Sequence, residues 1–305
     1  MNISISTNKD LPWASAGHTV AFEQFFLPSL LPHSKDLQVR STQPDTHSAG
    51  LKVTEEEDRI TVAGGESALL FVLSKKTGDI LHLGVEGKPS VVTSGGGPCT
   101  WRALTDNDGP SNESKLVIFC HIHAYTNLIP NMYFREWKNH RLDVSCHPQV
   151  TFFKTSKLKA EDHPKKCSGL AGEVVFIKLK TILPTETIAH NVTYIIDARG
   201  KVLMKNKLIP STKLESLCTL PRLGISFTVP RRCGHLHWYG RGPGENYCDR
   251  KRGSPVGVYN ETVENLLVPY IKPQSNGNRT GALLWDGCDF NFNFSQRCQM
   301  GRTHG

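Results

Sequence analysis

The stretch that decides the fold runs from residue 235 to residue 285 and reads HLHWYGRGPGENYCDRKRGSPVGVYNETVENLLVPYIKPQSNGNRTGALLW. It opens with residues 235–239, HLHWY, whose alternation suits a half-buried strand. Residues 240–244, GRGPG, are too rich in glycine and proline for a helix or a sheet interior and predict a loop. Farther on, Asn276-Gly277 is a strong hairpin signal, which predicts extended chain over 268–273 and a returning strand over 279–285.

The sequence outside this stretch also predicts β-structure. The clearest alternating or apolar runs cover residues 59–63, 68–73, 80–83, 174–180 and 190–196. Gly78 falls between two of these runs and is expected in a hairpin turn. Long helical patterns are absent. We therefore expect an all-β fold in which a large antiparallel β-sandwich begins at Leu51.

Composition narrows the classes of partner. The chain of 305 residues has room for one large or two smaller domains and carries a net charge of +8. Its basic residues are scattered and form no dense tract, so we expect no nucleic-acid partner. No apolar run reaches the ~20 residues of a membrane helix, and the N-terminus lacks the pattern of a signal peptide. These features predict a cytoplasmic protein with no membrane partner.

Cysteines and histidines give no clear metal site. The nine cysteines contain no C-x-x-C pair, which argues against a zinc ribbon, and we interpret them as reduced, packed thiols. His235 and His237 share one face of the predicted strand and would bind zinc if a third ligand joined them. No third ligand is identifiable, so we expect no metal in this chain.

A second polar stretch, residues 101–110, reads WRALTDNDGP. Its two carboxylates, Asp106 and Asp108, lie two residues apart, a spacing suited to a metal or to sugar hydroxyls. A calcium loop does not fit, because Gly109 comes too early. From the residues alone we favour a structural interpretation, in which Asp106 and Asn107 bond nearby backbone N–H groups of a turn.

Two motifs in the deciding stretch resemble a known family. Residues 238–250, WYGRGPGENYCDR, and 269–280, PYIKPQSNGNRT, are similar to G-x-G-P-x-E-N-Y-x-D-R and P-Y-x-x-P-x-E-N-G-x-R. These patterns belong to the C-terminal domain (domain 5) of LacZ-type β-galactosidases of glycoside hydrolase family 2, which some bacteria encode as a separate small chain. Ser275 departs from the family, which often has Glu there.

The resemblance extends along most of residues 10–295. Residues 13–24 resemble the W-x-x-A-G-H-x-x-A-x-x-Q pattern in the last strands of the immunoglobulin-like domain that precedes domain 5, and 101–108 resemble R-A-P-x-D-N-D. It implies a galactose-mutarotase-like supersandwich. We expect the end of an immunoglobulin-like sandwich over 1–27, a linker over 28–50, a truncated domain 5 over 51–295 and a divergent tail over 296–305. The strand near Val20 needs partners from preceding sequence, so the chain looks cut at its front.

The implied function is hydrolysis of terminal β-D-galactosides, such as lactose. Glycoside hydrolysis uses two carboxyl groups, and Glu245 and Asp249 are a tempting pair. We favour a structural role, in which they bond backbone donors or pair with Arg241 and Arg250. In the family the catalytic glutamates lie on a separate (β/α)₈ barrel, whose strand–helix alternation is absent here. We therefore expect no catalytic residue in this chain and no activity from it alone.

Instead, the resemblance implies that the chain walls the sugar site. The expected pocket rim, beside the mouth of the galactose site, comprises Asp106, Asn107, Asp108 and Gly109. The motif loop is expected to be structural and comprises Gly242, Pro243, Glu245, Asn246, Tyr247, Asp249 and Arg250. Trp238 and Tyr239 would suit stacking on a sugar ring, but we favour a place in the core or at its rim. The family's tryptophan platform for galactose has no counterpart after residue 295.

Cofactors and partners follow from the same resemblance. No cofactor is expected on this chain, whereas the family's catalytic part uses Mg and Na. The expected partners are the catalytic barrel and other domains of the same enzyme, a galactoside substrate and further copies in a homo-oligomer. A different function also fits the sequence, namely a non-catalytic β-sandwich that binds carbohydrate or another subunit.

Overall fold

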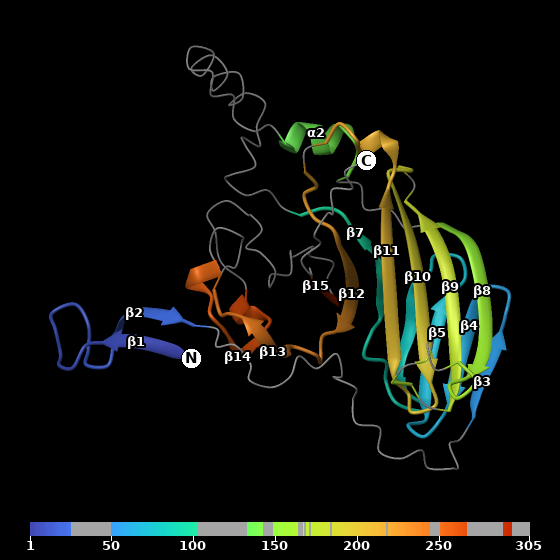
Figure 1. The fold of residues 1–305 in the computed structure, drawn as a ribbon, viewed down its shortest axis with the longest axis horizontal. Coiled ribbons are helices and arrows are strands. Elements are labelled where there is room, and N and C mark those ends of the chain that lie inside the picture. The colour runs from blue at the N-terminus through green and yellow to red at the C-terminus, as the bar shows by residue number, and fades with distance from the viewer. Residues whose placement is uncertain are drawn as a thin grey trace.

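A computed structural model describes residues 1–25, 50–102, 133–142, 149–163, 167, 169–170, 172–183, 185–217, 219–244, 251–266 and 289–294, with the backbone alone for 133–135 and 289–294. Antiparallel strands dominate these residues (Figure 1), as the sequence predicts. The one α-helix among them is α2 (Tyr133–Asn139). None of the described helices is long and apolar enough to span a bilayer.

Two four-stranded sheets form the largest part of the fold. The first has the order β3-β4-β5-β6 and contains three of the predicted strands. Its members are β3 (Leu51–Glu55), β4 (Arg59–Gly64), β5 (Leu69–Ser74) and β6 (Ile80–Val85). The second has the order β11-β10-β9-β8 and contains the other two. Its members are β8 (Gln149–Lys159), β9 (Glu173–Ile182), β10 (Ile188–Asp197) and β11 (Val202–Pro210).

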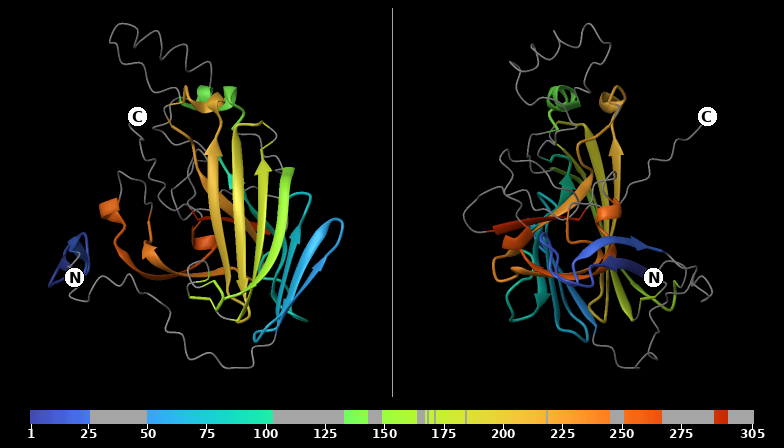
Figure 2. Two further views of the ribbon diagram at one scale, coloured as in Figure 1. Left: turned by 45° about the vertical axis from the view of Figure 1, so that its right-hand side comes forward. Right: turned by 90° about the vertical axis from the view of Figure 1, so that its left-hand side faces the viewer.

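The core lies between these two sheets, which face each other in Figure 2. Phe71 on β5 and Tyr194 on β10 meet across the interface with ring centroids 5.3 Å apart, and neither side chain is exposed. Alternate residues of β4, β5, β9 and β10 fill the same cluster, because successive side chains of a strand point to opposite faces. The predicted sandwich is therefore confirmed by its packing.

Turns at one end join the two sheets. Asp197, with no exposed surface, accepts hydrogen bonds at Oδ1 from the backbone N–H groups of Arg199 (3.1 Å) and Lys201 (2.9 Å). The carbonyl of Ala198 accepts a bond from the N–H of Glu66 in the turn after β4, at 2.8 Å. The β10–β11 turn is thereby fixed against the opposite sheet.

A third sheet, in the order β15-β12-β7, continues from the sandwich (Figure 1). It contains β7 (Ser94–Cys99), β12 (Gly224–Pro230) and β15 (Asp289–Phe294). Beside it a separate apolar cluster gathers helix α2 and the segment before β12, with Trp137 and Leu214 among its buried members. The sequence SGGGPC of β7 resembles a loop, and its place in a sheet was not predicted.

Two further hairpins lie away from the sandwich in Figure 1. One pairs β13 (His235–Arg241) with β14 (Val256–Thr262), so the predicted strand at 235–239 is confirmed, but Gly240 and Arg241 belong to the strand rather than to the predicted loop. The other pairs β1 (Asn2–Ser6) with β2 (Thr19–Gln24). Strand β1 supplies a partner for the predicted strand near Val20 that the sequence reading did not anticipate.

Candidate functional site

The β13–β14 hairpin brings two aromatic rings beneath the start of the motif loop. Trp238 lies directly opposite Tyr259, with ring centroids 5.4 Å apart and ring planes at 31°. The indole N–H of Trp238 donates to the carbonyl of Arg241 (3.1 Å), while the carbonyl of Pro255 accepts from the Tyr259 hydroxyl (2.8 Å) and the Gly242 N–H (3.1 Å). A Cβ atom on Gly242 would lie 2.5 Å from Cδ2 of Tyr259, so this close approach requires glycine.

The side chain of Arg241 bonds to the chain that returns from the motif loop. Its Nη1 donates to the carbonyl oxygens of Lys251 (2.6 Å) and Ser254 (3.0 Å), and Ser254 has no exposed surface. A charged donor strengthens such bonds, and their partly buried setting shields them from water. Arg241 therefore holds together the two ends of the loop that contains Glu245 and Asp249.

The N-terminal hairpin joins this hairpin through one side chain. The amide of Gln24 donates from Nε2 to the carbonyl of Val256 and accepts at Oε1 from the N–H of Val256, both at 2.7 Å. Val256 lies opposite Arg241 in the β13–β14 ladder. Gln24, the last residue of the W-x-x-A-G-H-x-x-A-x-x-Q pattern, thus attaches the first residues of the chain to the base of the motif loop.

The start of the polar stretch 101–110 is fixed by aromatic and backbone contacts. Arg102 donates from Nε to the carbonyl of Pro221 (2.7 Å), and its guanidinium lies over the ring of Trp137 at 5.3 Å from the centroid. Trp137 in turn donates from its indole N–H to the carbonyl of Thr219 (2.9 Å), and Trp101 contacts it edge to face at 6.3 Å. Trp101 and Arg102, at the start of the polar stretch 101–110, are therefore held in place by these contacts.

Most of the predicted site residues lie outside the described part of the chain. This holds for the expected rim, Asp106, Asn107, Asp108 and Gly109, and for five residues of the motif loop, Glu245, Asn246, Tyr247, Asp249 and Arg250. Gly242 and Pro243 are described and lie directly after β13, joined by a cis peptide bond. Sequence reading missed Gln24, Tyr259 and Arg102 as contact residues, because their partners are far away in the chain or are backbone atoms.

The other candidates considered from sequence do not converge on a site. His235 and His237 lie on the exposed face of β13, and no group of three potential metal ligands occurs in the described part of the chain. Tyr239 is 78% exposed and Trp238 is half-buried against Tyr259, so Trp238 fits the favoured place in the core or at its rim and Tyr239 does not.

Burial shifts the pKa of two side chains in the sandwich. Burial lowers the pKa of His190, although its hydrogen bond with Oδ1 of Asn206 (2.9 Å) opposes that shift. Burial likewise raises the pKa of Tyr194 far above its ordinary value, and the nearby carboxylate of Asp79 adds to the effect. A surface hollow of about 290 Å³ lies elsewhere, near Glu186, whose carboxylate pairs with Lys213 at 2.8 Å.

Comparison with known proteins supplies the family. A model of the β-galactosidase small chain matches residues 65–297, a range that begins in the first sheet and includes the whole β13–β14 hairpin. The chain belongs to this family. A β-galactosidase of Priestia megaterium is 30% identical over 282 residues, which cover 92% of this chain and 22% of the relative. A β-galactosidase of Psychromonas ingrahamii is 28% identical over 317 residues, covering 98% of this chain and 27% of the relative.

The matched segments are short compared with the relatives themselves. The chain spans about a quarter of the length of the curated β-galactosidases that it matches. The small-chain match confirms the family that the sequence resemblance predicts. The antiparallel sheets confirm the predicted all-β sandwich.

Proposed function

We propose that this chain is the sugar-site wall of a β-galactosidase that hydrolyses terminal β-D-galactosides. The observation that carries the proposal is the small-chain match over residues 65–297, together with the names of the relatives. In this proposal the sandwich is a rigid support, and the β13–β14 hairpin presents the motif loop to the site. The partners are the catalytic barrel and other domains of the same enzyme, which assembles as a homo-oligomer.

The proposal places the catalytic carboxyl groups outside this chain. A glycosidase holds one acid and one nucleophile or base on opposite sides of the scissile bond. Within the described residues, Asp197 is the one fully buried acidic side chain, and its carboxylate is bonded to backbone N–H groups of a turn. A carboxylate held in this way is suited to fixing a turn rather than to proton transfer.

Metal ions enter the proposal only through the rest of the enzyme. The family's catalytic part uses Mg and Na, and the described residues of this chain bring together no group of three His, Cys, Asp or Glu side chains. We therefore propose no metal site among the described residues, and the proposed role of this chain involves no step on a metal.

A complementation assay tests the proposed role. The chain is incubated with o-nitrophenyl β-D-galactoside, alone and with Priestia megaterium β-galactosidase from which the matching segment has been deleted. We expect no turnover by the chain alone and turnover well above that of the deleted enzyme after mixing, with albumin as the control. Co-elution of the two chains without restored turnover would contradict the wall role. Turnover by the chain alone that is lost in Glu245→Gln would contradict our placement of the catalytic carboxyl groups.

The proposed rim is tested in the same mixture. Asp106→Asn and Asp108→Asn remove one charge each without a large change in size. If these side chains contact substrate hydroxyls, KM should rise about tenfold to a hundredfold, because a lost bond to a charged group weakens binding by about 1.5–3 kcal/mol. Glu66→Gln, in a turn of the sandwich far from this motif in sequence, provides the control and should leave KM unchanged. Unchanged KM in both Asp variants would remove them from the rim.

A further inference from the structure

The outer face of the β8–β11 sheet carries an unusual concentration of lysine. We call this surface the lysine face and define it by two adjacent rows of directly opposed residues. One row is Lys154, Lys178, Thr193 and Lys205, and the next is Phe152, Lys180, Asn191 and Lys207. All five lysines are exposed, and the sheet is drawn in front of its partner in the left view of Figure 2.

None of the five lysines forms an ion pair with a described residue. The acidic side chain on the same face is Asp197, which is buried and paired with Arg199 at 3.4 Å. Lys154 and Lys178 lie directly opposite each other on neighbouring strands, an arrangement that is destabilising for like charges. The chain therefore places positive charges where they repel one another and lack a described counter-charge.

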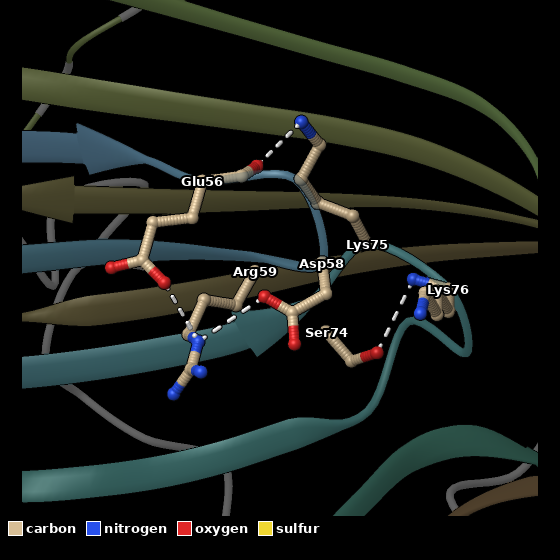
Figure 3. A network of polar contacts seen from close by, with 6 residues as sticks. All are labelled: Glu56, Asp58, Arg59, Ser74, Lys75 and Lys76. Atoms are coloured by element: carbon tan, nitrogen blue, oxygen red, sulfur yellow. Dashed lines mark hydrogen bonds and ion pairs between the residues drawn. The ribbon is translucent and has the colours of Figure 1, made fainter.

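Several charged side chains elsewhere in the described part of the chain form ion pairs with neighbours. Figure 3 shows the turn between β3 and β4, where the carboxylates of Glu56 and Asp58 approach Nε of Arg59 to 2.9 Å and 3.3 Å. Lys75 pairs with Glu55 at 2.8 Å beside the same turn. Three of the four carboxylates of this acidic turn already have basic partners within the chain, so Glu57 alone remains to pair with the lysine face of a second copy.

We propose that the lysine face is a docking surface for an acidic polypeptide segment in extended conformation. Side chains on one face of a strand repeat every two residues, or roughly 6.8 Å, and neighbouring strands are about 4.8 Å apart. Carboxylates at alternate positions of an extended segment therefore match the spacing of the lysines along the strands. This proposal is independent of galactoside hydrolysis.

The composition of the lysine face favours a polypeptide over other polyanions. Thr193 and Asn191 place a hydroxyl and an amide among the lysines, and such groups form directional hydrogen bonds with peptide groups. Exposed Phe152 and Leu203, 50% and 39% accessible, lie on the two outermost strands and add the apolar contact typical of protein interfaces. Single-stranded nucleic acids need several aromatic rings for stacking, and this face offers Phe152 alone among its described residues.

Binding of a labelled peptide in which glutamate alternates with threonine tests the proposal by fluorescence anisotropy. We compare Lys178→Glu/Lys205→Glu with Lys52→Glu/Lys88→Glu, which makes the same change in net charge at exposed positions off the lysine face. Affinity should fall at least about tenfold in the first variant, because reversed charges repel the peptide, and less than about twofold in the second. The neutral variant Lys178→Gln/Lys205→Gln should also bind the peptide more weakly. Because it introduces no repulsive charge, it is less prone to misfold, and thermal unfolding checks that each variant is folded.

Two outcomes would overturn the proposal. An equal loss of affinity in both charge-reversal variants would show that net charge alone attracts the peptide. Tighter binding to vesicles of equal parts phosphatidylserine and phosphatidylcholine, or to oligothymidylate, with the same dependence on Lys178 and Lys205, would reassign the surface to lipid or to nucleic acid.

Discussion

The sandwich and the β13–β14 hairpin are stabilised in different ways. Between the two sheets, fully buried apolar side chains such as Phe71 and Ile177 pack into one continuous core. In the hairpin, Trp238 and Tyr259 are only half-buried, and specific hydrogen bonds from side chains to backbone carbonyls define the geometry. Burial of many apolar side chains therefore stabilises the support, whereas a few directed contacts shape the surface that we propose lies at the sugar site.

The largest effect is expected from opening the sandwich core. Phe71→Ala removes a ring that has no exposed surface and faces Tyr194 at 5.3 Å. We expect the free energy of unfolding to fall by about 3–5 kcal/mol, through lost burial and the cavity left behind. Urea denaturation followed by far-UV circular dichroism measures the change. Phe152→Ala, on the exposed outer face, is the control and should cost less than about 0.5 kcal/mol.

A substitution at the turn contact that joins the two sheets should lower the free energy of unfolding almost as much. Gly65 has a positive φ of 74°, and an added Cβ would lie 2.3 Å from the carbonyl oxygen of Ala198. Gly65→Ala should cost about 3 kcal/mol, since backbone strain and a steric clash add together. Gly87 has a φ of 75° but nothing within 4 Å of an added Cβ, so Gly87→Ala should cost only about 1–2 kcal/mol. Equal costs in thermal or urea unfolding would show that the turn contact with Ala198 adds nothing.

This contrast also explains what the sequence predicts well. The sequence of β4 alternates because one face of the strand is buried in the core, and the apolar residues of β5, β9 and β10 also indicate buried strands. The same logic fails for β7, where SGGGPC has no apolar alternation and is held in the sheet by its pairing with β12. Strand β8 was also missed, because its exposed lysines and its bulge obscure the period.

The site is harder to predict because its contacts are not local. Gln24 and Val256 are separated by 232 positions, and the partner atoms are those of a backbone peptide group, which any residue would supply. The ring of Tyr259 leaves no room for a Cβ atom at residue 242. The glycine-rich motif indicates a tight turn, but the ring that makes glycine necessary lies on another strand, whose register sequence alone does not give.

In the hairpin we expect a smaller and more local effect. Gly242→Ala forces Tyr259 to move, because the added Cβ would lie 2.5 Å from the ring. The cost should be about 2 kcal/mol, typical of overpacking, and hydrogen exchange should accelerate at β13 and β14 while β9 and β10 remain protected. Gly244→Ala is the matched control, since its nearest atom, Oγ of Ser254, is 3.9 Å away. Uniform acceleration throughout the chain would mean that the hairpin and the sandwich unfold as one unit.

The smallest expected effect is a pH dependence of stability that arises in the sandwich and not in the β13–β14 hairpin. Burial lowers the pKa of His190 below its ordinary value of 6.5, so the unfolded chain takes up a proton there before the folded chain does. Stability should therefore be fully present above pH 6.5 and decline as the pH falls toward the folded pKa, with a slope from this residue of at most about 1.4 kcal/mol per pH unit. Urea denaturation at several pH values should show that His190→Gln removes this slope. The same substitution at exposed His237 in the hairpin should retain it, and a slope unchanged in His190→Gln would assign the acid sensitivity to another group.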